Sequence, residues 1–269
     1  MIFNLSMPVV KPKGPTASLT AQSGVTYTNG ISGISAEKMS LYAELISNNA
    51  SIANKTSVVY IDDGTNHYKV SIGDQVTLSL NGTNYAFDVI GFNHDTLTTS
   101  TAYGASTKTG KAGITFQMHD LFATTYKMNS TNTNSGGWKS SAMRTSTMAT
   151  MKGYMPAAWQ TAIKPVNKAS GTGGGSTSGT EIVSDSCFLL AEIEIFGSTT
   201  FSVSGEGTQY AYYKAGNSKV KHYLNDSDHW WTRSTNPGTS SDFCHVFVIG
   251  TAARAYANSS YGVAFGLCV

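Results

Sequence analysis

The sequence predicts an α+β fold, and three stretches of it carry this prediction. Residues 36–47 repeat apolar side chains at helical spacing and follow a serine, Ser35, that is suited to cap a helix. Residues 57–95 instead alternate β-branched and aromatic residues with polar ones, which is the period of half-buried strands. Near the C-terminus two adjacent tryptophans, Trp230 and Trp231, lie in a strand-like run. Because successive strand residues face opposite sides, we expect the two indoles on opposite faces and at least one of them fully buried.

The N-terminal region is predicted to attach the protein to its neighbours. Among Gly, Ser and Thr, residues 1–28 hold three of the six prolines: Pro8, Pro12 and Pro15. This composition favours an extended arm, which is either disordered or ordered by lying on a neighbouring subunit. The predicted helix follows the arm. We therefore expect an N-terminal arm and attachment helix over residues 1–54 and a β-rich domain over residues 55–269.

A small antiparallel β region is predicted after this helix. The dipeptides Asp63-Gly64 and Asn81-Gly82 favour the positive φ angles of tight hairpin turns. A further strand is expected within residues 113–122. Seven residues of the hairpin strands are expected to face inward: Val70, Val76, Leu78, Leu80, Tyr85, Phe87 and Val89.

The middle of the chain predicts two helices, a loop and a strand. One helix is expected over residues 143–153, and a second starts near Pro156 and stops before Pro165. The Gly/Ser/Thr-rich residues 168–180 predict a mobile surface loop. Residues 187–197 are mostly apolar with alternating glutamates and predict another strand.

Composition excludes several classes of function. Charged residues make up 13% of the chain and the net charge is +2, so no electrostatic footprint for nucleic acid or an anionic membrane is present. No stretch has membrane-spanning length and none resembles a signal peptide. We therefore expect the protein to stay in the cytoplasm or to leave the cell as part of a particle. Three cysteines are expected to be free buried thiols: Cys187, Cys244 and Cys268.

No residue pattern specifies catalysis or a metal. Glu192 and Glu194 resemble a carboxylate pair for glycoside hydrolysis, but we interpret them as the polar face of an alternating strand. The pairs His94-Asp95 and His119-Asp120 lack a nucleophile nearby and are interpreted as loop residues that bond to local backbone. We predict no catalytic residue, no cofactor and no metal site, and a bound structural cation is left open because the aspartates are few and scattered.

Several strings together resemble a known family. They are GFNHD, the run MNST…NSGGW…MRT, a P-x-x-W-Q-x-x-I-K-x-V-x-K helix, FLLAEIEIFG, and EGTQY…WWTRS…F-x-V…GVAFGLCV. Over residues 60–269 the chain resembles the domain of unknown function that is common in phages and prophages of gut Firmicutes. That domain is similar to the C-type-lectin-like fold of the variable proteins of diversity-generating retroelements. The resemblance implies a C-type-lectin-like domain whose strands carry a loop-bearing face, with a function in binding.

Two departures from the related proteins limit what the resemblance implies. Relatives often end in a Gly-Val-Arg-Pro-Ala pattern, whereas Gly262-Val263 is followed here by Ala264-Phe265-Gly266, so retroelement diversification is not supported. Formylglycine-generating enzymes are similar in fold, but no cysteine pair in this chain matches their chemistry. We therefore expect no enzymatic activity.

The resemblance and composition together predict a structural protein of a phage virion that presents a binding face, as a tail, baseplate or head-fibre adhesin. Its expected partners are other virion proteins, reached through the N-terminal arm, and a host cell-surface glycan or protein. We expect a homo-oligomer without nucleic acid and without membrane insertion. A structural capsid or tail decoration protein and a particle-borne cell-wall glycan hydrolase are the alternatives.

The predicted contact residues come from the last loops of the lectin-like fold, residues 235–242 and 251–261. Tyrosine and arginine there combine an apolar body with a polar tip, which gives much contact for little entropy lost. The alternative that these are ordinary solvated loop residues stays open. The predicted ligand-binding residues are His229, Asn236, Asp242, Arg254, Tyr256, Asn258 and Tyr261. Arg233, beside the core strand, is expected to bond backbone carbonyls or a carboxylate rather than a ligand.

Overall fold

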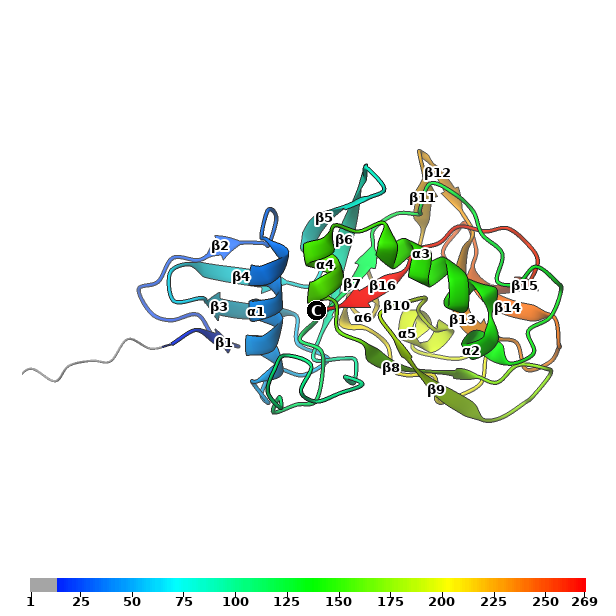
Figure 1. The fold of residues 1–269 in the computed structure, drawn as a ribbon, viewed down its shortest axis with the longest axis horizontal. Helices are drawn as coiled ribbons and strands as arrows, with labels where there is room; N and C mark the ends of the chain where they lie inside the picture. The colour runs from blue at the N-terminus through cyan, green and yellow to red at the C-terminus, as the bar shows by residue number, and fades with distance from the viewer. Residues whose placement is uncertain (1–13) are drawn as a thin grey trace, which may run out of the picture.

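Helices are mixed with several small sheets in the computed structural model, which describes residues 14–269 (Figure 1). This mixture confirms the α+β class. The part of the predicted arm in residues 1–13 lies outside the described residues. None of the helices in the described part of the chain is long and apolar enough to span a membrane.

The first unit is a four-stranded sheet with one helix packed on it. The strand order is β1-β3-β4-β2, in which only the β2–β4 pair is parallel. Helix α1 buries Met39, Tyr42 and Ile46 and contacts β1 and β3. The elements are β1 (Thr16–Ser18), β2 (Thr28–Asn29), α1 (Ala36–Ser47), β3 (Val58–Asp62) and β4 (His67–Ser71).

Helix α1 has the predicted bounds, and the reason is local. The Ser35 side chain accepts a hydrogen bond from the Lys38 N–H, as an N-cap does, and the Asn48 N–H closes the last turn on the Glu44 carbonyl. The boundary predicted after residue 54, however, lies inside this unit, because β3 and β4 complete the sheet that β1 and β2 enter. We call residues 14–72 the N-terminal unit; it shares one continuous apolar core with the rest of the molecule.

A five-stranded antiparallel sheet forms the centre of the molecule, in the order β10-β16-β7-β6-β5. The predicted turn joins β5 to β6, with positive φ at both Asn81 (48°) and Gly82 (84°). The C-terminal strand β16 lies between β7 and β10, so the chain ends inside its own core. The strands are β5 (Gln75–Leu80), β6 (Thr83–Phe92), β7 (Ile114–Met118), β10 (Cys187–Phe188) and β16 (Gly266–Cys268). Of the seven residues predicted to face inward, Tyr85 is half-buried and the others are buried.

Short helices cover one side of this sheet, and both predicted helices are confirmed. Met143, Met148 and Met151 point their side chains into the core, with a π-helical turn at the start of the segment. The bounds are α2 (Gly137–Ser140), η1 (Met143–Thr147), α3 (Met148–Gly153) and α4 (Ala157–Ala162).

The prediction of a mobile loop over residues 168–180 is wrong for its first part. Residues 168–171 belong to β8 (Val166–Gly171), which forms a hairpin with β9 (Thr180–Asp185). Lys168 is buried because its ammonium group finds carboxylate partners in the interior. Within the turn, Gly173 has a φ of 67°, and a Cβ there would lie 1.8 Å from the Asn134 carbonyl oxygen. The glycines therefore allow close packing here as well as a turn.

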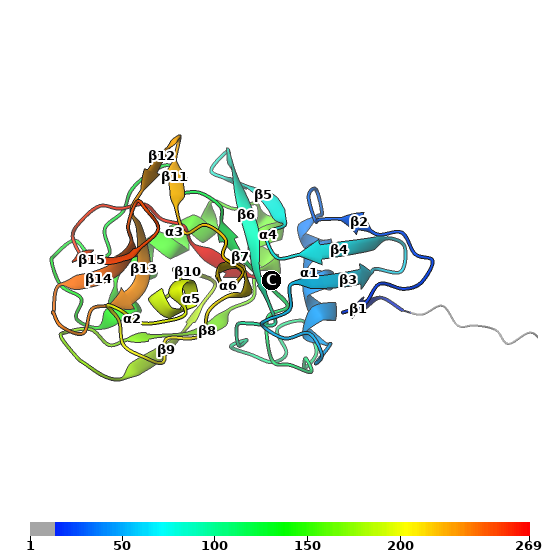
Figure 2. The same ribbon diagram turned by 180° about the vertical axis from the view of Figure 1, so that it is seen from behind.

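The end of the chain builds a hairpin and a three-stranded antiparallel sheet, β13-β14-β15, at the end of the molecule opposite the N-terminal unit (Figures 1 and 2). Both tryptophans of β13 are fully buried. Their indole N–H groups reach different segments, since Trp230 donates to the Lys219 carbonyl (3.0 Å) and Trp231 to the Tyr126 carbonyl (2.8 Å). The elements are α5 (Glu192–Phe196), α6 (Ala211–Lys214), β11 (Lys221–Tyr223), β12 (Asp226–Asp228), β13 (Trp230–Thr235), β14 (Asp242–Val246) and β15 (Ala252–Tyr256). The three cysteines are free and buried, as predicted.

Candidate functional site

The alternating glutamates of residues 192–194 lie in a helix, so the predicted strand is wrong beyond β10. The Glu194 carboxylate accepts a hydrogen bond from the Ala191 N–H (2.9 Å) and thereby caps the start of α5. Gly197 ends the helix with a φ of 75°. Acidic residues in the first turn also suit the positive end of the helix dipole. These capping contacts, together with burial of both carboxylates, favour the helix over the strand that alternation alone predicts.

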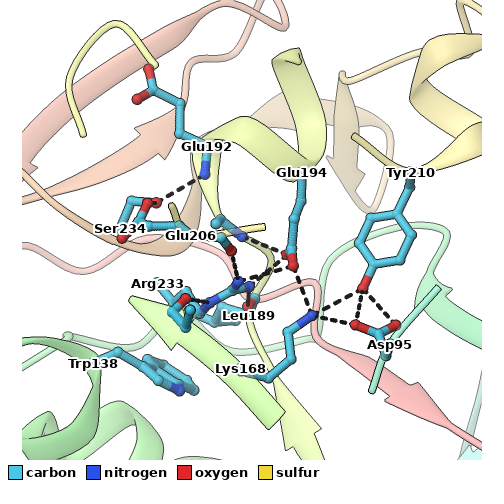
Figure 3. A network of polar contacts seen from close by, with 12 residues as sticks. Asp95, Trp138, Lys168, Leu189, Glu192, Glu194, Glu206, Tyr210, Arg233 and Ser234 are labelled. Atoms are coloured by element: carbon cyan, nitrogen blue, oxygen red, sulfur yellow. Dashed lines mark hydrogen bonds and ion pairs between the residues drawn. The ribbon is translucent and has the colours of Figure 1, made fainter. Parts of the chain in front are cut away.

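Glu194 belongs to a buried group of charges that includes Asp95, Lys168, Glu206 and Arg233, which we call the charge network (Figure 3). Lys168 donates its three ammonium hydrogens to Asp95 (2.7 Å), to Glu194 (2.8 Å) and to the hydroxyl of Tyr210 (3.1 Å). The five residues come from five separate elements of the chain.

Arg233 is the second cation of the charge network, and its bonding confirms the prediction made for it. Its side chain donates to three carbonyl oxygens, those of Ala169 (2.9 Å), Leu189 (3.0 Å) and Glu206 (2.6 Å). It also makes a two-pronged contact with Glu194, at 2.5 and 2.9 Å. These five bonds use the full donor capacity of a guanidinium.

The two cations decide which carboxyls of the charge network are ionised. Burial by itself opposes ionisation of Asp95, but Lys168 and the neighbouring His94 hold the pKa of that carboxyl well below its usual range. Burial likewise opposes ionisation of Glu194, and the pairing with Arg233 and Lys168 lowers its pKa. Glu206 differs, because burial outweighs Arg233 and raises its pKa from 4.5 to about 7.

The prediction that the two histidine–aspartate pairs bond only to local backbone is wrong. Asp95 accepts hydrogen bonds from Thr115 (2.6 Å) and Tyr210 (2.9 Å) in addition to Lys168, because its loop ends at the buried centre of the molecule. His119 pairs with Asp88 (2.8 Å) on the neighbouring strand, and this hydrogen bond raises the pKa of His119. Both corrections have one cause: the partners lie far away in the sequence.

Glu192 and Glu194 bond to different parts of the protein. The Glu192 carboxylate accepts hydrogen bonds from the N–H groups of Thr200 and Phe201 (3.1 and 3.0 Å) and from the Ser202 hydroxyl (2.6 Å). It thereby holds the loop that follows α5, whereas Glu194 faces the cations of the charge network (Figure 3). The two side chains have separate structural partners.

A cleft of about 290 Å³ opens above the charge network. Its walls are the loop after β6, strand β8 and the loop of residues 205–208. Asp95, Lys168, Glu194, Glu206 and Arg233 form its buried floor. Its rim residues are His94, Thr96, Lys111, Asn167, Gly205, Gly207 and Thr208. No group of three or more His, Cys, Asp or Glu with the arrangement of a metal site occurs within residues 14–269.

The predicted ligand-binding residues fall into an exposed set and a buried set. Arg254, Tyr256 and Asn258 are exposed, and Tyr256 has 60% of its surface accessible. The prediction that these three residues lie on one loop is wrong, because residues 252–256 form β15 at the edge of the sheet. Asn236 and Asp242 are buried, since each bonds within its own turn: Asn236 accepts from the Gly238 N–H (2.8 Å) and Asp242 from the Ser241 hydroxyl (2.7 Å).

His229 and Tyr261 join a further set of rings, which we call the aromatic cluster. His229 stacks on Tyr261 with ring centroids 4.7 Å apart and meets Phe247 edge-on at 4.5 Å. Trp231 and His245 each lie 4.8 Å from Tyr261. From the sequence, His229 and Tyr261 are predicted as ligand-binding residues in or near loops. His245 is not predicted, because it lies in an apolar strand and matches no motif. Its burial and its neighbour His229 lower the pKa of His245 from 6.5 to about 4.

Comparison with known families identifies the C-terminal part of the chain. The family described as Domain of unknown function (DUF6273) matches residues 112–269, which is more than half of the chain. The chain belongs to this family. No curated protein and no solved structure matches it. The DUF6273 match covers the elements from β7 to β16, and so includes four of the five charge-network residues and the aromatic cluster. Asp95 and the N-terminal unit lie outside it.

Proposed function

We propose that this DUF6273 protein is a structural component of a phage virion, which attaches through its N-terminal unit and presents the β13-β14-β15 sheet to a partner. The observation that carries the proposal is the position of these two parts at opposite ends of the long axis (Figures 1 and 2). An adhesin needs such a separation, because the end that is held by the particle is not available to the partner.

The β13-β14-β15 sheet combines a rigid, buried strand with accessible contact groups. All five residues of β14 are buried, whereas the outer strand β15 exposes Arg254 and Tyr256. Arg254 reaches back to Asp242 (3.3 Å), which fixes its direction without burying it. Tyrosine and arginine on a rigid support lose little conformational entropy on binding, so they are suited to anchor a cell-surface glycan or protein.

We extend the proposal to the fold of the DUF6273 part, which we assign to the C-type-lectin-like class. A closing strand within the central sheet, small peripheral sheets and a loop-rich distal end support this assignment. The separate structural partners of Glu192 and Glu194 support binding rather than glycan hydrolysis as the activity. Fold alone does not determine function, so the proposal is tested at the residues of the exposed end.

The test replaces Arg254, Tyr256 and Asn258 together by alanine. The purified parent should bind cells or cell-wall fractions of the bacterium that hosts the phage, and the triple variant should lose this binding. Because the three side chains are exposed, the unfolding midpoint should stay nearly unchanged. The control replaces two exposed lysines by alanine, Lys55 of the N-terminal unit and Lys108, and should bind like the parent.

Purified virions supply the second readout. The chain should be present in them at a fixed number of copies per particle. Its absence from virions contradicts the virion assignment. Its presence in virions without any binding of the parent to host cells or wall favours a decoration protein, and binding that survives the triple change places the contact face elsewhere.

A further inference from the structure

In the cleft above the charge network, the hydrogen-bond donors of the floor all have protein acceptors, whereas some donors of the rim do not. The floor cations donate all their hydrogens to protein acceptors, so they have none to offer a ligand. At the rim, the ammonium group of Lys111 bonds only the Thr96 hydroxyl (2.6 Å) among residues 14–269. Two of its hydrogens are therefore free.

The loop of residues 205–208, which lines the same cleft, offers further donors. The backbone N–H groups of Gly207 and Thr208 have no acceptor within the described chain. Gly207 has a φ of 135°, and a Cβ there would lie 2.9 Å from a Glu194 carboxylate oxygen. The glycine thus lets this wall pass close over the charge network. Lysine and backbone N–H groups are donors of the kind that bind a carboxylate.

The charges beneath the rim favour an anion over a cation. Lys111, Lys168 and Arg233 contribute three positive charges, against two from the ionised carboxylates of Asp95 and Glu194. The third carboxyl, Glu206, is only partly ionised near neutral pH, since burial raises its pKa to about 7. The cleft therefore has a small net positive charge.

The rest of the rim indicates the size and nature of the ligand. A volume of about 290 Å³ is at the lower end for a small-molecule site. Thr96, Asn167 and Thr208 offer groups that hydrogen-bond hydroxyls. No ring face is open for a neutral sugar to stack on, because the His94 ring lies against Tyr210, with centroids 3.9 Å apart.

We propose that this cleft binds a monosaccharide-sized acidic sugar, whose carboxylate is held by Lys111 and by the N–H groups of Gly207 and Thr208. The site is separate from the β13-β14-β15 sheet and does not depend on where the protein works. Its test uses isolated protein. If the cleft does not bind an acidic sugar, the adhesin proposal is unaffected, and if the adhesin proposal fails, the cleft proposal is unaffected.

The experiment titrates ¹⁵N-labelled full-length protein with glucuronate and follows the amide resonances by NMR. The signals of Gly207 and Thr208 should shift and saturate, whereas glucose at the same concentrations should leave them in place. Lys111→Met should weaken glucuronate binding about tenfold, the contribution of one charge-assisted hydrogen bond. Lys111→Arg should stay within about threefold of the parent, because it keeps the charge. Lys108→Met, on the same loop but outside the cleft, should bind like the parent.

Three results would overturn the proposal. The first is the absence of shifts at Gly207 and Thr208 at tens of millimolar glucuronate. The second is an equal response to glucose, which would assign the cleft to neutral sugars. The third is unchanged affinity in Lys111→Met together with a native spectrum. Acetate that reproduces the shifts at higher concentration supports recognition through the carboxylate.

Discussion

Strand β13 supports two buried polar clusters that are built in opposite ways. Arg233 belongs to the charge network, in which the five donated bonds of the guanidinium all end on protein oxygens. Two residues earlier, Trp231 belongs to the aromatic cluster. There both ring nitrogens of His245 and the Nδ1 of His229 are buried without a partner among the described residues.

The difference determines which protonation state each cluster needs. The charge network keeps Arg233, Lys168 and two carboxylates ionised, because every charge faces an opposite one. The aromatic cluster keeps His245 neutral, since no acceptor is present to receive a second ring hydrogen. The stability of the charge network therefore depends on each of its charged residues. The stability of the aromatic cluster depends on His245 remaining unprotonated.

The largest expected effect is the loss of Arg233. Replacing it by methionine leaves Glu194 with a single cation, Lys168, and three carbonyl oxygens without a donor. Breaking a buried pair in this way costs about 3–5 kcal/mol of unfolding free energy. Urea denaturation of parent and variant measures it.

The matched control is Arg254→Met, which removes an arginine from a half-exposed ion pair on the same sheet. That change should stay within about 0.5 kcal/mol of the parent. The double variant Arg233→Met/Glu194→Gln also removes the charge of Glu194, which has lost its arginine partner. It should therefore recover part of the lost unfolding free energy. Equal costs for the two arginines would show that the charge network does not contribute more than a surface pair.

The same comparison explains what the sequence predicts and what it does not. The bounds of α1 follow from the residues that flank the helix, Ser35 and Asn48, and were predictable. The bonding of Arg233 was predictable in kind, because a guanidinium beside a core strand must find acceptors. Its partners were not, since they arise from tertiary contacts. Lys168 meets Asp95 across 73 positions and was hidden in a Gly/Ser-rich stretch.

The helix α5 shows where local pattern misleads. The alternation of Glu and Ile over residues 192–195 has the period of a strand, and strand propensity of isoleucine supports it. Capping of the helix by the Glu194 side chain and its contact with Arg233 outweigh that pattern. For the candidate contact surface, the sequence located Arg254, Tyr256 and Asn258 but not the strand that carries two of them.

The aromatic cluster should make the protein sensitive to acid through His245. Because its pKa is lowered from 6.5 to about 4, the unfolded chain takes up this proton first as the pH falls, and stability is lost. Between about pH 7 and pH 5 the expected loss is about 2 kcal/mol. Replacing His245 by phenylalanine, which fills the space with a neutral ring, should remove this loss from the pH profile of urea denaturation.

The difference between the parent and His245→Phe is the quantity to follow, since the other titrating groups cancel in it. His222→Phe, on the exposed hairpin, is the control and should keep the profile of the parent. A profile of His245→Phe that runs parallel to the parent would mean that His245 finds a proton acceptor when it is charged.

An effect of about the same size and opposite sign comes from Glu206 in the charge network. Its folded pKa of about 7 exceeds the ordinary 4.5, so the folded state holds the proton more tightly, and stability is lost as the pH rises. From about pH 7 to pH 5 this carboxyl should add about 2 kcal/mol, which offsets the loss at His245. Glu206→Gln keeps an acceptor for the Gly171 N–H and removes the titration, so on acidification from pH 7 to pH 5 its stability should fall relative to that of the parent. In the double variant with His245→Phe the two changes should add, because the clusters have no shared partner. A Glu206→Gln profile that coincides with the parent would show that Glu206 stays ionised, and that the charge network holds three carboxylates against its two cations.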